Sequence, residues 1–336
     1  MTADALLVLS FGGPERPDEV IPFLRNVTRG RDVPDERLAE VAAQYELFGG
    51  RSPLNDQCRA LVAAVESELD RSGLDLPVYW GNRNWHPYLT DTVAAMADDG
   101  ITEALVFVTS AFGSYSGCRQ YREDLDRAAT AVGPRAPRLS KLRLYYNHPG
   151  FIEPLAEALA AAITPTELAT GATRLVFTAH SIPASMAAGC DYVHQLNEAA
   201  RLVVEGAGLV STPFDLVYQS RSGPPHVPWL EPDINDHLGT LTDRGTSSVV
   251  LVPVGFTSDH MEVLFDLDTQ AAATAERLGI ELTRVPTVGR HPRFVAMIRE
   301  LVEERVAGAP RRALGGDGPW PDHCPADHCP PPARRP

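Results

Sequence analysis

His180 stands where an apolar run at residues 175–177 gives way to the loop Ser-Ile-Pro183. A histidine in such a place caps a helix, or its neutral imidazole is offered to a metal ion or a proton. His180 taken alone leaves both interpretations open.

A strongly acidic segment, Asp259-His-Met-Glu-Val-Leu-Phe-Asp-Leu-Asp268, follows another apolar run. Glu262 and Asp266 are four residues apart and therefore share one face if the segment is helical. Two stacked carboxylates repel each other unless a cation or a proton lies with them. An acidic first helical turn that complements the helix dipole is the simpler explanation. It accounts for Asp259 but poorly for Asp266, which lies beyond the first turn.

Several familiar motifs are absent. Gly12-Gly13-Pro14 lacks the lysine of a phosphate-binding loop, and no G-x-G-x-x-G follows a strand. Tyr115 occupies the position where a hydrolase elbow needs serine. Nucleotide and hydrolase chemistry are therefore disfavoured.

Short apolar runs alternate with longer segments of helical periodicity, which is typical of α/β proteins with parallel sheets. We expect strands at residues 5–11, 77–80, 104–109, 142–145, 174–177, 214–218 and 248–254, and helices at 38–48, 58–69, 89–96, 151–163, 193–204 and 294–306. The pattern predicts two Rossmann-like doubly wound parallel-sheet domains with a cleft between them. The expected boundaries are 1–146, 147–307, and a proline-rich, irregular tail at 308–336.

In such sheets ligands bind beyond the carboxyl ends of the strands. The sequences expected there are rich in polar, aromatic and glycine residues: Ser10-Phe-Gly-Gly-Pro14, Gly81-Asn-Arg-Asn84, Thr109-Ser-Ala-Phe112, Ala179-His-Ser-Ile-Pro183, Gln219-Ser-Arg-Ser-Gly223 and Gly255-Phe-Thr-Ser-Asp-His260. His180 and the acidic segment are thus expected at the edge where chemistry takes place.

The composition limits the class of protein. The chain has 336 residues, which favours two domains, and a formal net charge of -14 that argues against nucleic-acid partners. The sequence shows neither a secretory signal nor an apolar run that would cross a bilayer. Five spread-out cysteines do not suggest a disulfide framework. We expect a cytoplasmic enzyme that handles small molecules or cations.

Six segments in order resemble the ferrochelatases, over nearly all of the chain up to about residue 306. They are Ser-Phe-Gly-Gly-Pro14, Phe-Gly-Gly-Arg-Ser-Pro-Leu54, Phe-Thr-Ala-His-Ser-Ile-Pro183, Tyr-Gln-Ser-Arg-Ser-Gly-Pro-Pro225, Trp-Leu-Glu-Pro-Asp233 and Pro-Val-Gly-Phe-Thr-Ser-Asp-His-Met-Glu262. The family fold is two Rossmann-like domains with a porphyrin cleft between them (class II chelatase-like). The chain is most similar to the actinobacterial enzymes that insert Fe²⁺ into coproporphyrin III in haem biosynthesis, so a lyase of that kind, mostly monomeric among soluble relatives, is expected.

The resemblance implies roles for individual residues. His180 and Glu262 correspond to the catalytic pair at the iron, and Asp266 to a guiding site in an acidic row. One further carboxylate of that row in some relatives is Gln270 here, which argues against an outer metal site. Ser52 and Tyr121 correspond to porphyrin contacts, and Phe11 replaces a tyrosine that ligates product iron in some relatives.

Porphyrin carries propionates, for which hydroxyl and guanidinium groups are suitable partners. Besides Ser52 and Tyr121, the candidate propionate partners are therefore Tyr45, Arg29 and its neighbours Arg25 and Arg31. A solvated basic face is the alternative for the arginines. Metal insertion removes two pyrrole protons, and the sequence leaves open whether His180 or Glu262 accepts them.

Cys324 and Cys329 lie in the tail with His323 and His328 nearby, which admits a zinc site or simply reduced thiols. Many actinobacterial ferrochelatases instead hold a 2Fe–2S cluster with three tail cysteines and one internal cysteine. The resemblance implies such a cofactor here with Cys118, Cys324 and Cys329. Gly315 lies near the third tail position, and Cys190 is the less favoured internal partner.

Two other functions are compatible with parts of this pattern. A cobalt chelatase of the same fold tends to use paired histidines at the metal, whereas this chain has Glu262 at the second position. A porphyrin or haem carrier needs no carboxylate opposite the histidine and would offer an axial ligand, which Phe11 is not.

Overall fold

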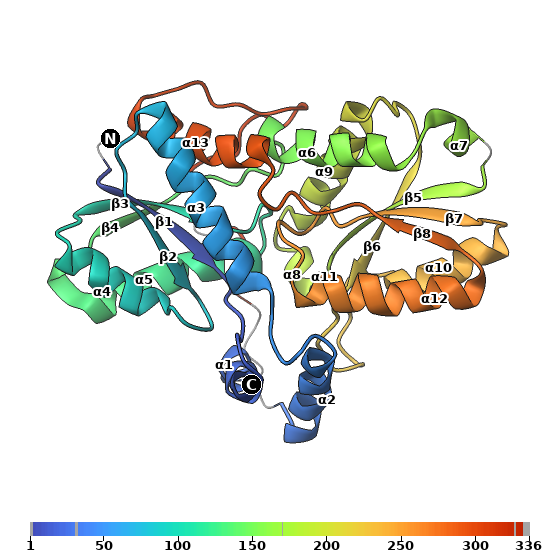
Figure 1. Ribbon diagram of the computed structural model, residues 1–336, viewed down its shortest axis with the longest axis horizontal. Coiled ribbons are helices and arrows are strands. Elements are labelled where there is room, and N and C mark those ends of the chain that lie inside the picture. Colours follow the sequence, from blue (N-terminus) through green and yellow to red (C-terminus); the bar gives the residue numbers. More distant parts are fainter. Residues whose placement is uncertain (1–2, 31–32, 170, 326, 332–336) are drawn as a thin grey trace. The chain divides into compact units, whose positions relative to one another are not determined.

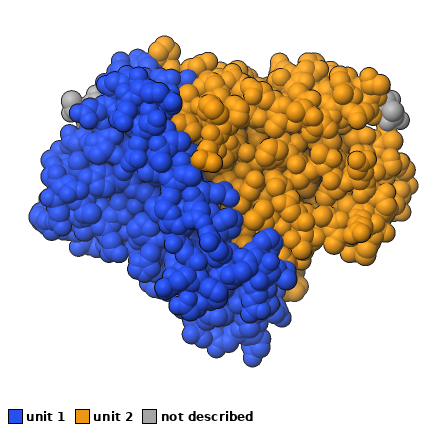
Figure 2. Space-filling model, viewed as in Figure 1, with its two compact units in different colours: residues 1–109, 121–142, 298–309 blue, residues 110–120, 143–297, 310–336 orange. Residues whose placement is uncertain are grey.

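The computed structural model describes residues 3–30, 33–169, 171–325 and 327–331. They form two compact units (Figure 1; Figure 2). Unit 1 comprises Met1–Thr109, Tyr121–Leu142 and Ile298–Ala309, and unit 2 comprises Ser110–Gln120, Arg143–Met297 and Pro310–Pro336. The expected boundaries at 146 and 307 stay a prediction.

Unit 1 is built on a parallel sheet with the strand order β2-β1-β3-β4. Its strands are β1 (Ala5–Ser10), β2 (Val78–Asn82), β3 (Glu103–Val108) and β4 (Arg138–Lys141). Its helical elements are η1 (Pro17–Glu19), α1 (Val20–Val27), α2 (Asp35–Glu46), α3 (Leu54–Ser72), α4 (Leu89–Asp98), α5 (Gln120–Val132, from Tyr121 onward) and η3 (Gly133–Arg135). β1 is fully buried, and α4 and α5 pack their apolar faces on the side of the sheet that carries Leu7 and Leu9.

Unit 2 repeats this plan with the order β6-β5-β7-β8. Its strands are β5 (Thr173–His180), β6 (Phe214–Gln219), β7 (Ser248–Val252) and β8 (Glu281–Arg284). Its helical elements are the π-helical turns η2 (Tyr115–Arg119) and η4 (Asp266–Ala271), with α6 (Pro149–Ala162), α7 (Pro165–Ala169), α8 (Ala184–Ala187), α9 (Tyr192–Gly206), α10 (Ile234–Asp243), α11 (Met261–Phe265) and α12 (Ala272–Leu278). α13 (Pro292–Val306) runs from unit 2 into unit 1.

Helices cover both faces of the second sheet. α6 and α9 pack together on one side, and α10, α11 and α12 lie on the other (Figure 1). This second group buries Val176, Val217 and Leu251 of the strands against Leu238 and Val263 of the helices. The expectation of two parallel, doubly wound α/β sheets is confirmed.

One expected strand is wrong. Residues 142–145 lie beyond β4, whose own residues Arg138–Lys141 pair with the start of β3. The amide of Leu142 still donates to the Val106 carbonyl at 2.8 Å, and the chain then leaves the sheet and enters unit 2. The segment is buried for a different reason: Tyr145 packs against Phe151 and Phe294, and none of these contacts belongs to a sheet.

The short strand β8 was not expected. Its residues alternate between exposed and half-buried, because it lies at the edge of the sheet and pairs only with β7. A search for continuous apolar runs passes over such a strand. Among the described residues, no helix has both the length and the apolar character that a bilayer crossing demands.

Candidate active site and cysteine group

The order β6-β5-β7-β8 has its switch point between β5 and β7, which is where open α/β sheets bind ligands. His180 is the last residue of β5, and the loop after β7 leads to α11 and Glu262. The fold therefore brings both predicted residues to one edge of one sheet.

Gly255 makes this approach sterically feasible. A Cβ atom at this position would lie 2.6 Å from both Cα and Cβ of Ala179, closer than side chains tolerate. The Gly255 amide also donates to the Thr178 carbonyl at 3.0 Å. The β7 loop thus lies against the end of β5, beside His180, only because residue 255 has no side chain.

The imidazole of His180 is oriented through Nδ1, which donates to the carbonyl of Ser181. In the neutral ring the proton is then on Nδ1 and the lone pair is on Nε2. Nε2 lies 3.6 Å from Oε1 of Glu262, and the hydroxyl of Tyr192 donates to the His180 carbonyl at 3.0 Å. The nitrogen suited to a metal or a proton thus faces a carboxylate.

Glu262 is positioned through its backbone. Nδ1 of His260, the N-cap of α11, accepts from the Glu262 amide at 3.2 Å. The buried Gln219 at the end of β6 donates from Nε2 to the Glu262 carbonyl at 2.7 Å. Two neighbouring loops thereby fix the residue whose side chain meets His180.

The pair is electrostatically matched. Burial acts to lower the His180 pKa, but the charge and hydrogen bond of Glu262, the Ser181 carbonyl and the charge of Asp266 together raise it above its usual value. Burial acts to raise the Glu262 pKa, but His180 lowers it to about 2. Since the side chains are 33% and 46% exposed, solvent moderates both shifts.

Asp266 begins the π-helical turn η4, where the helix widens after α11. The Ser220 hydroxyl donates to its carboxylate. Burial raises the Asp266 pKa to about 7, the Ser220 hydrogen bond opposes the rise, and the charge of Glu262 adds to it. Asp266 thus keeps a proton up to near neutral pH, which reduces the repulsion between the two adjacent carboxylates.

The expected porphyrin contacts belong to unit 1. Ser52 is buried, while Phe11 is 39% exposed and packs edge-to-face on Phe23, whose ring also contacts Tyr45. Arg29 is exposed, and Arg31 lies outside the described residues.

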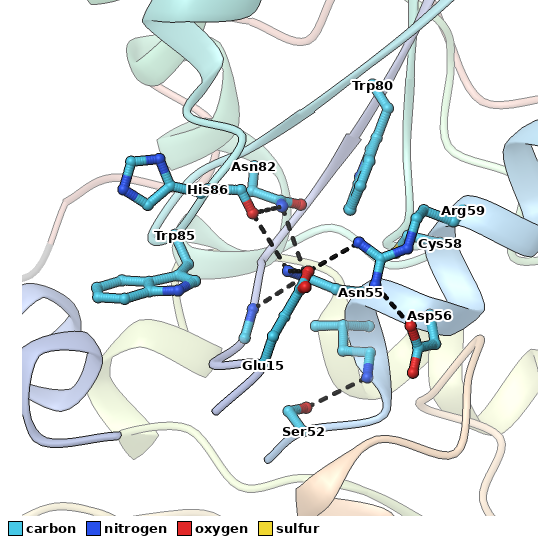
Figure 3. A network of polar contacts seen from close by, with 12 residues as sticks. Glu15, Ser52, Asn55, Asp56, Cys58, Arg59, Trp80, Asn82, Trp85 and His86 are labelled. Carbon is cyan, nitrogen blue, oxygen red and sulfur yellow. Dashed lines mark hydrogen bonds and ion pairs between the residues drawn. The ribbon is translucent and has the colours of Figure 1, made fainter. Parts of the chain in front are cut away.

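A buried polar network fixes the loops that carry Phe11 and Ser52 (Figure 3). Asn55 accepts from the Gly13 amide at 3.2 Å and donates to Glu15 at 2.8 Å. Asn82 accepts from the Ser10 hydroxyl, and both asparagines donate to the His86 carbonyl. The loop after β1 is therefore held by α3 and by the end of β2.

Tyr121 is almost fully buried in the same unit. The guanidinium of Arg83 lies 5.0 Å from the centre of its ring and forms an ion pair with Asp124 at 2.9 Å. Burial raises the Tyr121 pKa, so its hydroxyl stays protonated. Sequence reasoning missed Arg83 and Ser220, although both lie in the strand-end loops it singled out.

Four of the five cysteines gather in unit 2. The Cys190 thiol donates to the Met186 carbonyl at 3.3 Å, and its interaction with Cys329 lowers the Cys190 pKa to about 7. Cys118 and Cys324 are close enough to influence Cys329 electrostatically. Cys58 is the exception, since it lies buried in unit 1 beside Ser10.

Cys190, the less favoured candidate, thus has the largest influence on the pKa of Cys329. Gly315 lies near the expected third tail position in the sequence, and a Cβ there would lie 2.1 Å from Oε1 of Glu198 on α9. Within the described ranges, no three His, Cys, Asp or Glu side chains are arranged to hold a single metal ion.

Two Rossmann-like units with a histidine and a carboxylate at a switch point define a chelatase-like protein. Its fold is similar to SirB from Bacillus subtilis with Fe3+, with a TM-score of 0.51 and 13% identity over 90% of this chain and 97% of that one. This likeness concerns the fold alone.

The family follows from the sequence comparisons. Residues 3–306 match the family model Ferrochelatase, and the chain belongs to that family. It is 56% identical to the coproporphyrin III ferrochelatase of Frankia alni, over 99% of this chain and 88% of the relative. It is 55% identical to that of Nocardia farcinica, over 100% and 99%.

Proposed function

We propose that this protein inserts Fe²⁺ into coproporphyrin III during haem biosynthesis, as the names of its close relatives indicate. The single observation that carries the proposal is the 3.6 Å approach of His180 Nε2 to Glu262 Oε1 at the switch point of unit 2. A proton acceptor and an anionic metal ligand side by side are what porphyrin metallation requires.

The overall reaction exchanges one Fe²⁺ for two pyrrole protons. His180 accepts each proton at Nε2, because Nδ1 is engaged with the Ser181 carbonyl. The charge of Glu262 stabilises the resulting imidazolium, which explains the raised His180 pKa. The partly exposed ring then releases each proton to water.

Glu262 supplies the anionic oxygen that attracts Fe²⁺, an ion that accepts both oxygen and nitrogen ligands. Its pKa of about 2 keeps it ionised at neutral pH. Asp266 is the next acidic group, and we assign it the guiding role for incoming iron once it has lost its proton.

The porphyrin partners belong to unit 1. We assign Ser52 and Tyr121 to hydrogen bonds with the ring periphery and Arg29 to a propionate. Phe11 and Tyr45 would supply apolar and edge-to-face contacts to the macrocycle. The network around Asn55 supports this assignment, because it holds the loops of Phe11 and Ser52 in one conformation.

The substrate is tested by anaerobic incubation of the full chain with Fe²⁺ and either coproporphyrin III or protoporphyrin IX, followed by absorbance. We expect faster conversion of coproporphyrin III. Faster conversion of protoporphyrin IX would refute the substrate but leave the reaction intact. Glu276→Gln, a neutralised exposed carboxylate on α12, serves as the control variant and should retain full activity.

We also propose that the cysteine group holds a 2Fe–2S cluster. Such clusters take four thiolates, and four cysteines, Cys118, Cys190, Cys324 and Cys329, belong to unit 2. When bound, the cluster would supply a one-electron redox centre. The mutual influence of Cys190 and Cys329 supports Cys190 as the fourth ligand.

Iron content, acid-labile sulfide and visible absorbance of the anaerobically reconstituted chain test the cluster. We expect Cys190→Ser to lose both iron and sulfide and Cys58→Ser to retain them. Wild-type protein without sulfide would refute the cluster. We further propose that the chain acts as a monomer in the cytoplasm, which light scattering and cell fractionation would test.

A further inference from the structure

Four carboxylates lie in residues 259–268, the segment that contains α11 and the start of η4. Two of them have partners at the ends of β5 and β6. Glu262 lies 3.6 Å from His180, the last residue of β5, and Asp266 accepts from the hydroxyl of Ser220, which follows β6. Since β6 and β5 are neighbours in the sheet, both carboxylates lie on the side where iron insertion is proposed.

The other two, Asp259 and Asp268, are called here the outer carboxylates, and they share a partner at the opposite edge of the sheet. This partner is Arg284, the last residue of the edge strand β8. Its Nη1 lies 3.1 Å from Oδ1 of Asp259, and its Nη2 donates to Oδ2 of Asp268 at 2.9 Å. Its Nε donates to the other oxygen of Asp268. The guanidinium thus engages both outer carboxylates with all three of its nitrogens.

These ion pairs are better shielded than ordinary surface pairs. The side chain of Arg284 is 19% exposed, and those of Asp259 and Asp268 are 29% and 32% exposed. Two parallel N–H···O bonds to Asp268 give that pair a fixed geometry. The guanidinium does not lose its proton in proteins, so it stays available to both carboxylates whatever the pH.

Without Arg284, the outer carboxylates would be free to bind iron, because carboxylate oxygens are ligands for divalent metal ions. Asp259 is three residues before Glu262 in the sequence. Asp268 is two residues after Asp266. Each is therefore close to a carboxylate that is proposed to handle iron. Iron held by an outer carboxylate would have to dissociate before it could enter the porphyrin.

We propose that Arg284 is a positioning residue for metal insertion: it withholds the outer carboxylates from iron, which therefore meets Glu262 and Asp266. In this role Arg284 itself contacts neither iron nor porphyrin. The inference rests on the proposed iron insertion and adds a residue outside the catalytic pair.

Arg284→Met tests this role in the full chain, because it keeps an unbranched side chain and removes the guanidinium. Fe²⁺ binding without porphyrin is measured by anaerobic equilibrium dialysis, and kcat and KM for Fe²⁺ with coproporphyrin III are measured by absorbance. The freed outer carboxylates should make Fe²⁺ bind about tenfold more tightly than to wild type. Because this binding is unproductive, kcat and KM should fall together and leave kcat/KM unchanged, whereas a merely structural defect would lower kcat/KM.

The decisive variant combines Arg284→Met with Asp259→Asn and Asp268→Asn. It removes the carboxylates that Arg284→Met sets free, so Fe²⁺ affinity, kcat and KM should return to their wild-type values. A residue with only a structural role would not be rescued in this way, because the triple variant also lacks the ion pairs of Arg284.

Arg201→Met is the matched control. Arg201 on α9 is likewise held by two carboxylates, those of Glu198 at 2.7 Å and Glu205 at 2.8 Å. α9 and α11 cover opposite faces of the sheet (Figure 1). The control therefore frees two carboxylates away from residues 259–268, and it should bind Fe²⁺ and turn over like wild type.

If Arg284→Met does not fold, as judged by circular dichroism, Arg284→Lys is measured in its place. Lysine offers a point charge instead of a fork and engages one outer carboxylate, so the same joint fall of kcat and KM is expected at smaller size. A folded Arg284 variant with wild-type kcat and KM, or a triple variant as slow as Arg284→Met, would overturn the role of Arg284 alone. A wild type that converts neither coproporphyrin III nor protoporphyrin IX would overturn the proposed function and this role with it.

Discussion

The Nε2 atom of His180 lies 3.6 Å from Oε1 of Glu262, although His180 ends β5 and Glu262 belongs to α11, which follows β7. Nδ1 donates to the Ser181 carbonyl, so in the neutral ring the lone pair is on Nε2 and faces the carboxylate. Each residue shifts the pKa of the other toward its charged form. This mutual dependence underlies the first prediction.

His180→Ala and Glu262→Gln should each abolish metal insertion, since each removes one half of the proton-and-metal exchange. Loss of a positioned acid–base group costs roughly 100- to 10,000-fold in rate. Porphyrin binding, followed by the shift in its absorbance, should persist in both variants. Near-normal turnover by either one would contradict the assignment.

Asp266 should give metal insertion a pH dependence near neutrality. Its pKa of about 7 means that it ionises as the pH rises through that value, which adds a negative charge beside Glu262. The KM for Fe²⁺ should fall by about tenfold across this range, equivalent to ~1.4 kcal/mol of attraction. Asp266→Asn should lack this dependence.

Ser220→Ala is the companion variant to Asp266→Asn. It removes the hydrogen bond that lowers the Asp266 pKa, so the same fall in KM should move to higher pH. Anaerobic initial rates between pH 6 and 8 measure both variants. A wild-type KM that is flat over this range would exclude the guiding role.

Buried His148 should make the fold sensitive to acid. Its Nδ1 accepts from the Gly150 amide at 3.0 Å at the start of α6, and burial lowers its pKa to about 2. Below pH 6.5 the unfolded chain binds a proton there that the folded chain does not, so stability falls as the pH falls. The slope approaches ~1.4 kcal/mol per pH unit.

Urea unfolding at several pH values between 7 and 4 measures this slope. His148→Asn keeps a residue type that caps helices and removes the titrating group. The variant should lose less stability than wild type over that range. Equal slopes would show that other groups dominate.

Asn55→Ala should destabilise unit 1 by about 2–4 kcal/mol, because it removes the partner of the Gly13 amide and two further hydrogen bonds. Asn197→Ala, which removes one exposed hydrogen bond on α9, should stay within ~0.5 kcal/mol of wild type. Urea unfolding monitored by tryptophan fluorescence measures both. The network would be dispensable if the two variants unfolded alike.

Much of the architecture could be predicted because its signals are local. The buried strand β1 is a continuous apolar run, and α9 shows helical periodicity along its length. The two differences between the expected and the observed strands also have local causes. Tyr145 is buried through contacts made outside any sheet, and β8 is polar because it is an edge strand.

The sequence by itself determined the fold class, the family, and the residue types at the candidate site, because strand periodicity and motif order are written along one chain. Only the tertiary structure decided which side chains meet. The approach of His180 to Glu262, the Ser220 bond to Asp266 and the influence of Cys329 on Cys190 each join residues distant in sequence. Such contacts depend on how loops at neighbouring strand ends pack, as Gly255 shows against Ala179, and no spacing along the chain encodes that packing. Glu262 was recognisable as a carboxylate from its sequence, but its orientation toward Nε2 of His180 is a product of the fold.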